Sequence, residues 1–286
     1  MDYLYLTFAV MLVAGTNILG KLYNQKNAMR VGAASLYTLI LVASAFIFWL
    51  VAFILDPQYD MTVLPYAVIF SLCYTAANAG LIYALKHGSV TFTSLFGKMS
   101  LILVSVWGLF FWNEPFTLTA CIGLILCAIS IFLCLYKGKE DRNINMRWIF
   151  FVSLFLLGNA GCSIVQKTQQ MDFSGQYGTF MMLIAMGVAT LICGGAYIIC
   201  HKEQSRETVG SWYLPTTAGL MSAGLNLLVI ILATSSLSAS LIYPTLASGG
   251  LIVVCISAIF IFKEKMRSIG WVGVALGLVA TALLSL

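Results

Sequence analysis

The feature that most constrains this chain is a succession of ten continuous apolar runs, each long enough to cross a lipid bilayer. A hydrocarbon core about 30 Å thick needs about 20 apolar residues per helix. We predict ten spanning helices near residues 3–20, 31–55, 65–85, 89–112, 116–136, 147–165, 177–200, 212–234, 237–262 and 269–286. Only 9% of the 286 residues are charged, against about a quarter in a soluble domain. The sequence therefore predicts an all-α integral membrane protein with short connections.

The ten runs read as five followed by the same five again. Polar, proline and glycine positions correspond between the copies: Leu64-Pro65 with Leu214-Pro215, Glu114 with Glu264, and Gly123 with Gly273. Because five is odd, the second copy enters the membrane from the opposite side. Inverted repeats of this kind are typical of carriers that alternate access around a central site. We predict a first repeat over residues 3–136 and a second over residues 147–286.

The basic residues indicate the orientation in the membrane. Thirteen of the fifteen Lys and Arg residues lie in connections that follow odd-numbered runs, whereas Lys167 lies on the opposite side and Lys98 lies within a run. Since cytoplasmic loops carry an excess of Lys and Arg, both termini are predicted to be non-cytoplasmic. The expected location is the plasma membrane, which is the inner membrane if the source is bacterial. The net charge of +5 comes from residues that flank lipid, so we expect no nucleic-acid partner.

Short motifs at the ends of the runs resemble a known repeat. Tyr83-Ala84-Leu85, Gly88-Ser89 and Phe111-Trp112-Asn113-Glu114-Pro115 in the first half, and Ser238-Ala239-Ser240, Pro244 and Phe262-Lys263-Glu264 in the second, are similar to the EamA repeat. Over its whole length the chain resembles the EamA-type ten-helix transporters of the drug/metabolite transporter superfamily. The resemblance implies a basket of helices around a central cavity and efflux of metabolites such as amino acids, or of toxic organic molecules. Members often have cytoplasmic termini, whereas the charges here predict the opposite.

One expected group is missing. The small multidrug members of the superfamily carry a glutamate in the middle of the first helix, where this chain has Met11-Leu12-Val13. The corresponding part of the sixth run has Ala160-Gly161 and no acid nearby. All ten Asp and Glu residues fall in connections or at the ends of runs. Cation and proton exchange on a buried carboxylate is therefore not carried over to this protein.

Lys98 is the first candidate for substrate binding, because it lies about ten residues into the fourth run. A lysine near the bilayer centre costs at least about 2.5–3.5 kcal/mol and usually faces a cavity or a partner. The position is similar to that of a lysine in the sugar-phosphate and organic-anion branches of the superfamily, which implies pairing with a carboxylate or phosphate. Alternatively, the side chain extends to an interface. Ser248 holds the equivalent position in the second copy, so the additional basic residues of the phosphate carriers are missing.

Uncharged polar residues within the runs form the rest of the candidate site. An unpaired hydroxyl or amide is costly in hydrocarbon, so these side chains should face the interior or another helix. The alternative for any one of them is close packing between helices. With Lys98, the predicted substrate-binding residues are Ser94, Asn17, Tyr74, Asn78, Ser163, Asn226, Tyr243 and Ser248.

The sequence favours a secondary transporter that alternates access and exports small organic metabolites, with amino acids and organic anions as the expected substrates. A multidrug efflux carrier of lipophilic compounds is the alternative, and a channel or an intramembrane enzyme is disfavoured. No HExxH motif, no pair of aspartates and no Ser/His arrangement lies within the runs, and none of the eight cysteines forms a CxxC pair. We therefore expect no catalysis, cofactor or metal. The expected partners are a small-molecule substrate and lipid, with the protein acting as a monomer or a homodimer.

Overall fold

The computed structural model describes most of the chain. The described residues are 2–27, 33–87, 90–112, 118–135, 146–200, 211–238 and 268–284, with short stretches at 241–243, 245–246, 249–250, 252–253 and 256. Their helices are α1 (Asp2–Asn27), α2 (Ala33–Leu55), α3 (Leu64–His87), α4 (Val90–Phe111), α5 (Leu118–Leu135), α6 (Met146–Asp172), α7 (Gly178–Cys200), α8 (Tyr213–Ala233) and α10 (Ser268–Leu284). A short 3-10 helix, η1 (Met61–Val63), precedes α3.

Nine of the ten predicted runs are helices in the described part of the chain. Six of these helices, α1, α2, α3, α6, α7 and α8, are long and apolar enough to cross a membrane. The ninth predicted run, 237–262, lies mostly outside the described residues. The described protein is therefore a helical, multi-pass membrane protein, while the tenth helix and the inverted repeat stay predictions.

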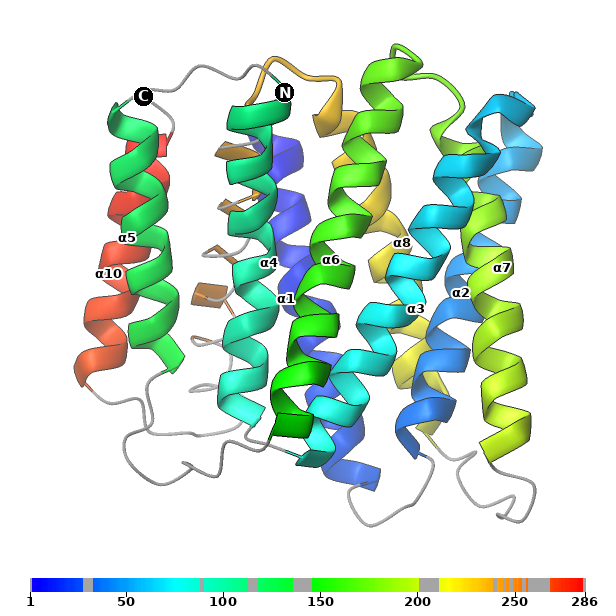
Figure 1. The fold of residues 1–286 in the computed structure, drawn as a ribbon, viewed down its shortest axis with the longest axis horizontal. Helices are drawn as coiled ribbons and strands as arrows, with labels where there is room; N and C mark the ends of the chain where they lie inside the picture. Colours follow the sequence, from blue (N-terminus) through cyan, green and yellow to red (C-terminus); the bar gives the residue numbers. More distant parts are fainter. Residues whose placement is uncertain are drawn as a thin grey trace.

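The helices stand side by side in a bundle, and α1 begins at the end of the bundle where α10 finishes (Figure 1). We call this the Asp2 end and the opposite end the Lys26 end. Both ends are held by contacts between helices: Tyr66 donates to Asp172 at the Asp2 end over 2.5 Å, and Lys26 donates to the Tyr213 hydroxyl at the other over 2.7 Å. Which end faces the cytoplasm stays a prediction from the charges.

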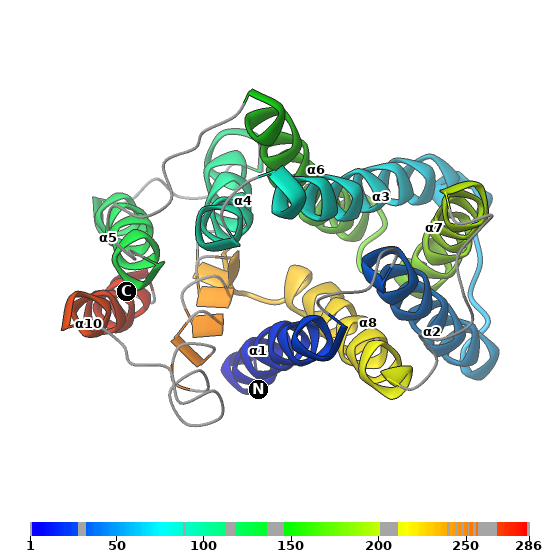
Figure 2. The same cartoon turned by 90° about the horizontal axis from the view of Figure 1, so that it is seen from below.

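Viewed along the helices, α5 and α10 form a pair to one side of the bundle (Figure 2). The Ser130 hydroxyl of α5 donates to the Gly273 carbonyl of α10 over 2.7 Å. The remaining helices pack α3 on α6, α1 on α8, and α2 on both α7 and α8. Large apolar side chains that cover this surface, such as Ile54, Phe110 and Leu191, are exposed as expected of residues that face lipid.

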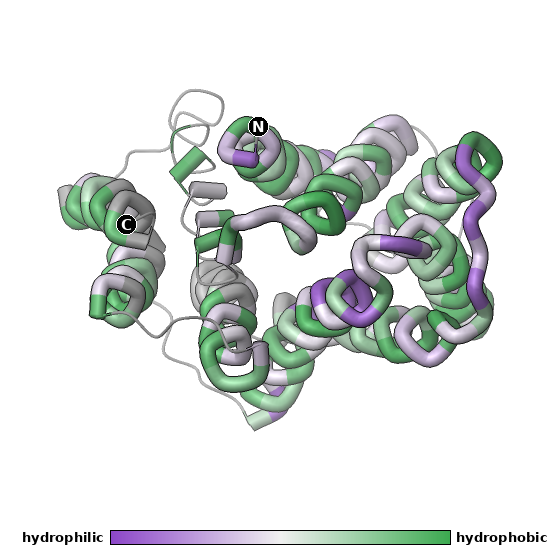
Figure 3. Tube along the Cα trace, turned by 90° about the horizontal axis from the view of Figure 1, so that it is seen from above, coloured by the Kyte–Doolittle hydropathy of each residue, from purple (hydrophilic) through white to green (hydrophobic). Residues whose placement is uncertain are grey.

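The two largest apolar clusters of the described residues lie in the interior. The first joins α2, α3 and α7 around Trp49, Phe70 and Met182. The second joins α1, α6 and α8 and includes Ala160 and Tyr243. Hydrophilic residues gather on the connection between α2 and α3 and on the last turns of α6 (Figure 3).

The sequence prediction for the sixth helix was too short. The apolar run ends near residue 165, but α6 continues to Asp172 through Gln166-Lys167-Thr168-Gln169-Gln170. These residues remain helical because most of their side chains are buried against the rest of the protein, whereas in a loop they would be exposed to solvent. The helix ends at Asp172 and is followed by a turn in which Gly175 has a φ of +83°, which suits glycine. The Gly175 N–H donates to the Gln170 carbonyl over 2.8 Å.

Candidate functional site

Polar side chains of α3 and α8 meet around Tyr74. The Tyr74 hydroxyl is near enough to interact with the side chains of Asn78 and Ser222, and the Asn78 amide donates to the Tyr74 carbonyl over 2.8 Å. Cys162 on α6 and Cys193 on α7 pack on the same apolar cluster as Tyr74. Tyr74 is ten residues into α3, about 15 Å along the helix. Two helices, α3 and α8, thus contribute polar groups to one place at mid-depth.

The polar contacts continue from Ser222 toward the Asp2 end. The Asn226 amide of α8 donates to the Ser222 carbonyl over 2.8 Å. In turn, Gln166 Nε2 of α6 donates to the Asn226 carbonyl over 3.1 Å. Gln166 is only 2% exposed, so this bond ties α6 to α8 inside the protein. We call Tyr74, Asn78, Ser222, Asn226 and Gln166 the polar track.

Ser163 and Tyr243 meet at a neighbouring position of α6. The Tyr243 hydroxyl donates to the Ser163 carbonyl over 3.4 Å, and Tyr243 is 1% exposed. Since the carbonyl of Ser163 accepts this bond, the pairing depends on the backbone of α6 rather than on the serine hydroxyl. The structure therefore brings Ser163 and Tyr243 together, as it does Tyr74, Asn78 and Asn226.

The other four predicted site residues cannot be added to this geometry. The backbone of Asn17 lies in α1 and that of Ser94 and Lys98 in α4, but their side chains are outside the described part of the structure. Ser248 lies outside the described residues altogether. A role for these residues in binding stays a prediction.

Two features near the end of α6 were missed from the sequence. Lys167 was predicted to lie in the connection after the sixth run. It is instead in α6 and only 5% exposed. Its Nζ lies 4.8 Å from the centroid of the Trp112 ring. Gln169 and Gln170 are fully buried, and Gln169 Nε2 donates to the Gln176 carbonyl over 2.9 Å. The available signal was helical spacing: positions 166, 169 and 170 share one face of a helix.

The described carboxylates stay away from the polar track. Asp2, Asp56, Asp60 and Asp172 lie at a helix end or in a connection. Within the described ranges, no three His, Cys, Asp or Glu side chains gather into a potential metal site. Hydroxyls, amides and thiols make up the described part of this site, so its chemistry is hydrogen bonding.

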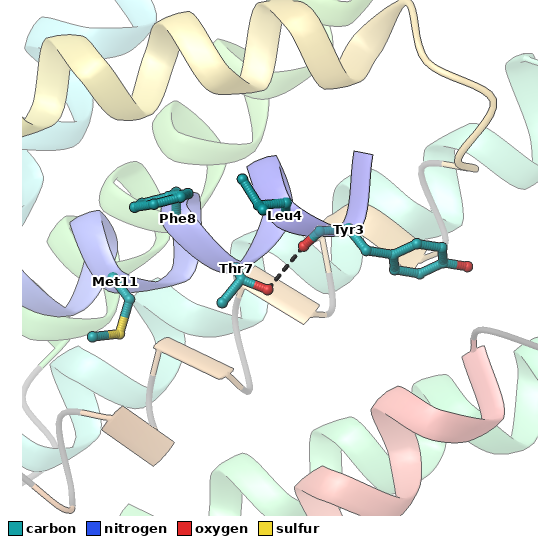
Figure 4. Close-up of a pocket in the computed structure, with 5 residues that line it drawn as sticks. All are labelled: Tyr3, Leu4, Thr7, Phe8 and Met11. Carbon is teal, nitrogen blue, oxygen red and sulfur yellow. Dashed lines mark hydrogen bonds between the residues drawn. The ribbon is translucent and has the colours of Figure 1, made fainter. Parts of the chain in front are cut away.

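A shallow pocket lies elsewhere, on one face of α1 (Figure 4). It is lined by Tyr3, Leu4, Thr7, Phe8 and Met11. The Thr7 hydroxyl already donates a hydrogen bond to the Tyr3 carbonyl over 2.8 Å. Apart from that hydroxyl its surface is largely apolar. It contains none of the predicted binding residues and suits a lipid chain better than a polar solute.

Comparison with solved structures shows the same fold in another protein. A crystal structure titled only "Crystal structure of protein" has a TM-score of 0.76 and 13% sequence identity, with 99% of this chain and 95% of that chain covered. At this identity the likeness concerns the fold alone. No match was found among the curated proteins.

Comparison with protein families identifies the first half of the chain. Residues 2–136 match the EamA-like transporter family. These residues include α1 to α5 and thus two members of the polar track, Tyr74 and Asn78. This first half of the chain is thus similar to the EamA-like transporter family, which is part of the drug/metabolite transporter superfamily.

Proposed function

We propose that this protein is an alternating-access secondary transporter of the plasma membrane that exports small polar organic metabolites, namely amino acids or organic anions. Its family is one of membrane transporters, which argues against an enzyme. The observation that carries the proposal is the polar track inside an apolar bundle: the Tyr74 hydroxyl interacts with the side chains of Asn78 and Ser222, and the amides of Gln166 and Asn226 donate to backbone carbonyls of α8.

The composition of the track favours a polar solute. Buried hydrogen-bonding groups are costly in an apolar surrounding unless they are paired. The Tyr74 hydroxyl interacts with Asn78 and Ser222, and all three residues are only half-buried. Such groups can exchange their mutual bonds for bonds to the ammonium, carboxylate or amide of a substrate. Lys98, if its side chain faces the same interior, adds the positive charge that an anion requires.

The described acids argue against exchange of lipophilic cations for protons. That mechanism needs a carboxylate within the membrane, and the described carboxylates are at the ends of the bundle. The predicted inverted repeat supports alternating access, because it provides two halves that can rock around a site between them. Export follows from the family resemblance.

Flux into proteoliposomes tests the proposal. A panel of amino acids, organic acids and cationic dyes is offered with and without a pH gradient, and wild type is compared with Lys98→Ala. We expect saturable counterflow of an amino acid or organic anion, and loss of anion flux in Lys98→Ala. Uptake of lipophilic cations without anions would instead support multidrug efflux, and flux that does not saturate would indicate a channel.

A further inference from the structure

We infer that the side-chain oxygen of Gln170 is a binding position for an ammonium group at the Asp2 end of the polar track. The inference rests on the proposed function and chooses within it: solutes that carry an ammonium group, such as amino acids, rather than organic anions that lack one. Gln170 is 1% exposed, and its Oε1 is buried without a hydrogen-bond partner among the described residues. Because buried polar groups in native proteins nearly always have a partner, a donor brought by a solute would gain a bond there without displacing one.

The orientation of the Gln170 amide follows from its neighbours. The Gln176 carbonyl can only accept, so Gln169 presents Nε2 to it, over 2.9 Å. The Gln169 amide therefore has its oxygen toward Gln170, and Gln170 Nε2 donates to that oxygen. Exchanging the nitrogen and oxygen of Gln170 would place two acceptor oxygens against each other. Oε1 is thus the atom of Gln170 that is left without a donor.

Gln170 extends the polar track by one helical turn. It lies four residues after Gln166 on the same face of α6, and Gln166 donates to the Asn226 carbonyl of α8. Ile230 in turn lies four residues after Asn226. A Cβ atom on Gly178, at the start of α7, would lie 2.5 Å from Gln170 Nε2 and 3.2 Å from Ile230 Cγ2. Gln170 and Ile230 therefore meet one turn beyond the contact between Gln166 and Asn226.

The oxygen of Gln170 is turned away from the start of α7. The Gln170 atoms closest to the Cβ position on Gly178 are Nε2 at 2.5 Å and Cδ at 3.4 Å, and Oε1 is not as close. The first N–H groups of a helix carry partial positive charge, which disfavours a cation. Oε1 thus points away from the one helix start beside this amide, as a position for an ammonium group requires.

The polar track itself also offers acceptors. The amide nitrogens of Asn78, Gln166 and Asn226 each donate to a backbone carbonyl. Their side-chain oxygens can only accept. A solute that follows the track therefore meets amide oxygens, which bind the N–H groups of an ammonium better than a carboxylate.

A purely structural role for Gln170 makes a different prediction. Gln170 supports Gln169, which holds the connection to α7 through the Gln176 carbonyl. In that connection Ser174 and Tyr177 have φ values of 52° and 59°, a strained conformation for residues other than glycine. Loss of this support alone would lower stability and impair every solute equally. Loss of a binding position would affect only solutes that carry the ammonium group.

The experiment uses glutamate and glutarate, a pair of solutes that differ by the ammonium group. Counterflow and equilibrium binding are measured for the full chain in proteoliposomes, with wild type, Gln170→Met, Gln170→Glu and Gln176→Met. Methionine keeps the length of the side chain and removes both polar atoms, whereas glutamate at position 170 keeps an acceptor oxygen in either ionisation state. Gln176 is exposed at the same end of the bundle, so Gln176→Met is the matched control.

We expect wild type to bind glutamate at least tenfold more tightly than glutarate, the usual effect of a hydrogen bond to a charged group. Gln170→Met should weaken the affinity for glutamate about tenfold and change that for glutarate by less than threefold. Gln170→Glu should keep the preference for glutamate, and Gln176→Met should match wild type. Size-exclusion profiles and thermal midpoints confirm that each variant is folded.

The outcomes separate this inference from the function on which it rests. Equal affinities of wild type for glutamate and glutarate would overturn it, and this measurement needs no variant. An unchanged preference in Gln170→Met would also overturn it, as would an equal loss of both solutes, which indicates a structural glutamine. If wild type carries glutarate but no amino acid, the ammonium position is wrong while the transporter stands. If wild type carries no member of the wider panel, the proposed function itself fails.

Discussion

Gly80 of α3 and Gly158 of α6 bring the backbones of their two helices into direct contact. A Cβ atom on Gly158 would lie 2.7 Å from both the Ala77 nitrogen and the Cys73 carbonyl oxygen. A Cβ atom on Gly80 would lie 2.6 Å from the Phe155 nitrogen. Small residues are what membrane helices use for such close approach. Because Tyr74 and Asn78 are on the same stretch of α3, this contact also sets the distance between the polar track and α6.

Gly158→Ala is expected to destabilise the protein by about 1–3 kcal/mol, the usual effect of overpacking a tight contact. The new methyl group would meet backbone atoms, which cannot rotate away. Thermal unfolding in detergent provides the measurement.

The control for that substitution is Gly195→Ala in α7. No heavy atom lies within 4 Å of the position of its added Cβ, and alanine has the higher helix propensity. We expect its thermal midpoint to equal or exceed that of wild type. Equal midpoints for Gly158→Ala and wild type would show that α3 and α6 can separate without loss.

The fold could largely be predicted from sequence, since nine of the apolar runs are helices in the described residues. The exception is the end of the sixth helix. A hydropathy average over a window of residues predicted that the sixth helix ends near residue 165. In the structure α6 continues to Asp172, and Gln166, Gln169 and Gln170 are buried in it. Burial of glutamine depends on partners from distant segments, such as the Asn226 carbonyl. A local average cannot detect those partners.

The candidate site was predicted in part. The cost of an unpaired polar group in hydrocarbon identified Tyr74, Asn78 and Asn226, which the structure brings into one track. The same argument did not select Ser222, because a serine in a membrane helix is most often a packing residue. Lys167 was missed because it follows the apolar run. Lys98, the residue most strongly indicated by its charge, has a side chain outside the described part.

Tyr74→Phe should reduce transport without unfolding the protein. The change removes a hydroxyl that interacts with Asn78 and Ser222 and keeps the ring that stacks on Phe70 at 6.1 Å. Loss of about one hydrogen bond to the substrate predicts a threefold to tenfold lower transport efficiency. Initial rates of counterflow in proteoliposomes measure it.

Tyr83→Phe is the matched control on the same helix. Tyr83 stacks on Phe151 at 5.0 Å, but it is exposed at the far end of α3. We expect its transport rate to equal that of wild type. If both tyrosine variants behave like wild type, the Tyr74 hydroxyl takes no part in binding and the polar track is structural.

Gln166→Ala should weaken the contact between α6 and α8. It removes the buried donor to the Asn226 carbonyl, which keeps its bond within α8. We expect a loss of about 0.5–1.5 kcal/mol in stability, which is the typical net contribution of one hydrogen bond. The control is Gln176→Ala, whose side chain is exposed at the same end of the bundle and whose carbonyl, the acceptor for Gln169, is retained. A larger effect at Gln176 than at Gln166 would contradict the assignment.

Asp60 should make the connection before α3 sensitive to acid. Its carboxylate accepts from the Thr62 N–H over 2.8 Å and caps η1. The backbone hydrogen bond from Thr62, followed by that from its side chain, holds the pKa of Asp60 below its ordinary value of 3.8. Because the folded form has the lower pKa, the cap contributes its full stability above about pH 3.8 and loses it as the pH falls through the folded value.

The measurement is the thermal midpoint of wild type, Asp60→Ala and Asp60→Asn between pH 6 and pH 2.5. The difference between wild type and Asp60→Ala should be largest near pH 6 and shrink toward the acid limit. Asparagine keeps an acceptor oxygen but does not titrate, so the difference between Asp60→Asn and Asp60→Ala should not change with pH. A constant difference between wild type and Asp60→Ala over the whole range would mean that ionisation of Asp60 adds nothing to the cap, since only the charged form gains strength from accepting the Thr62 N–H.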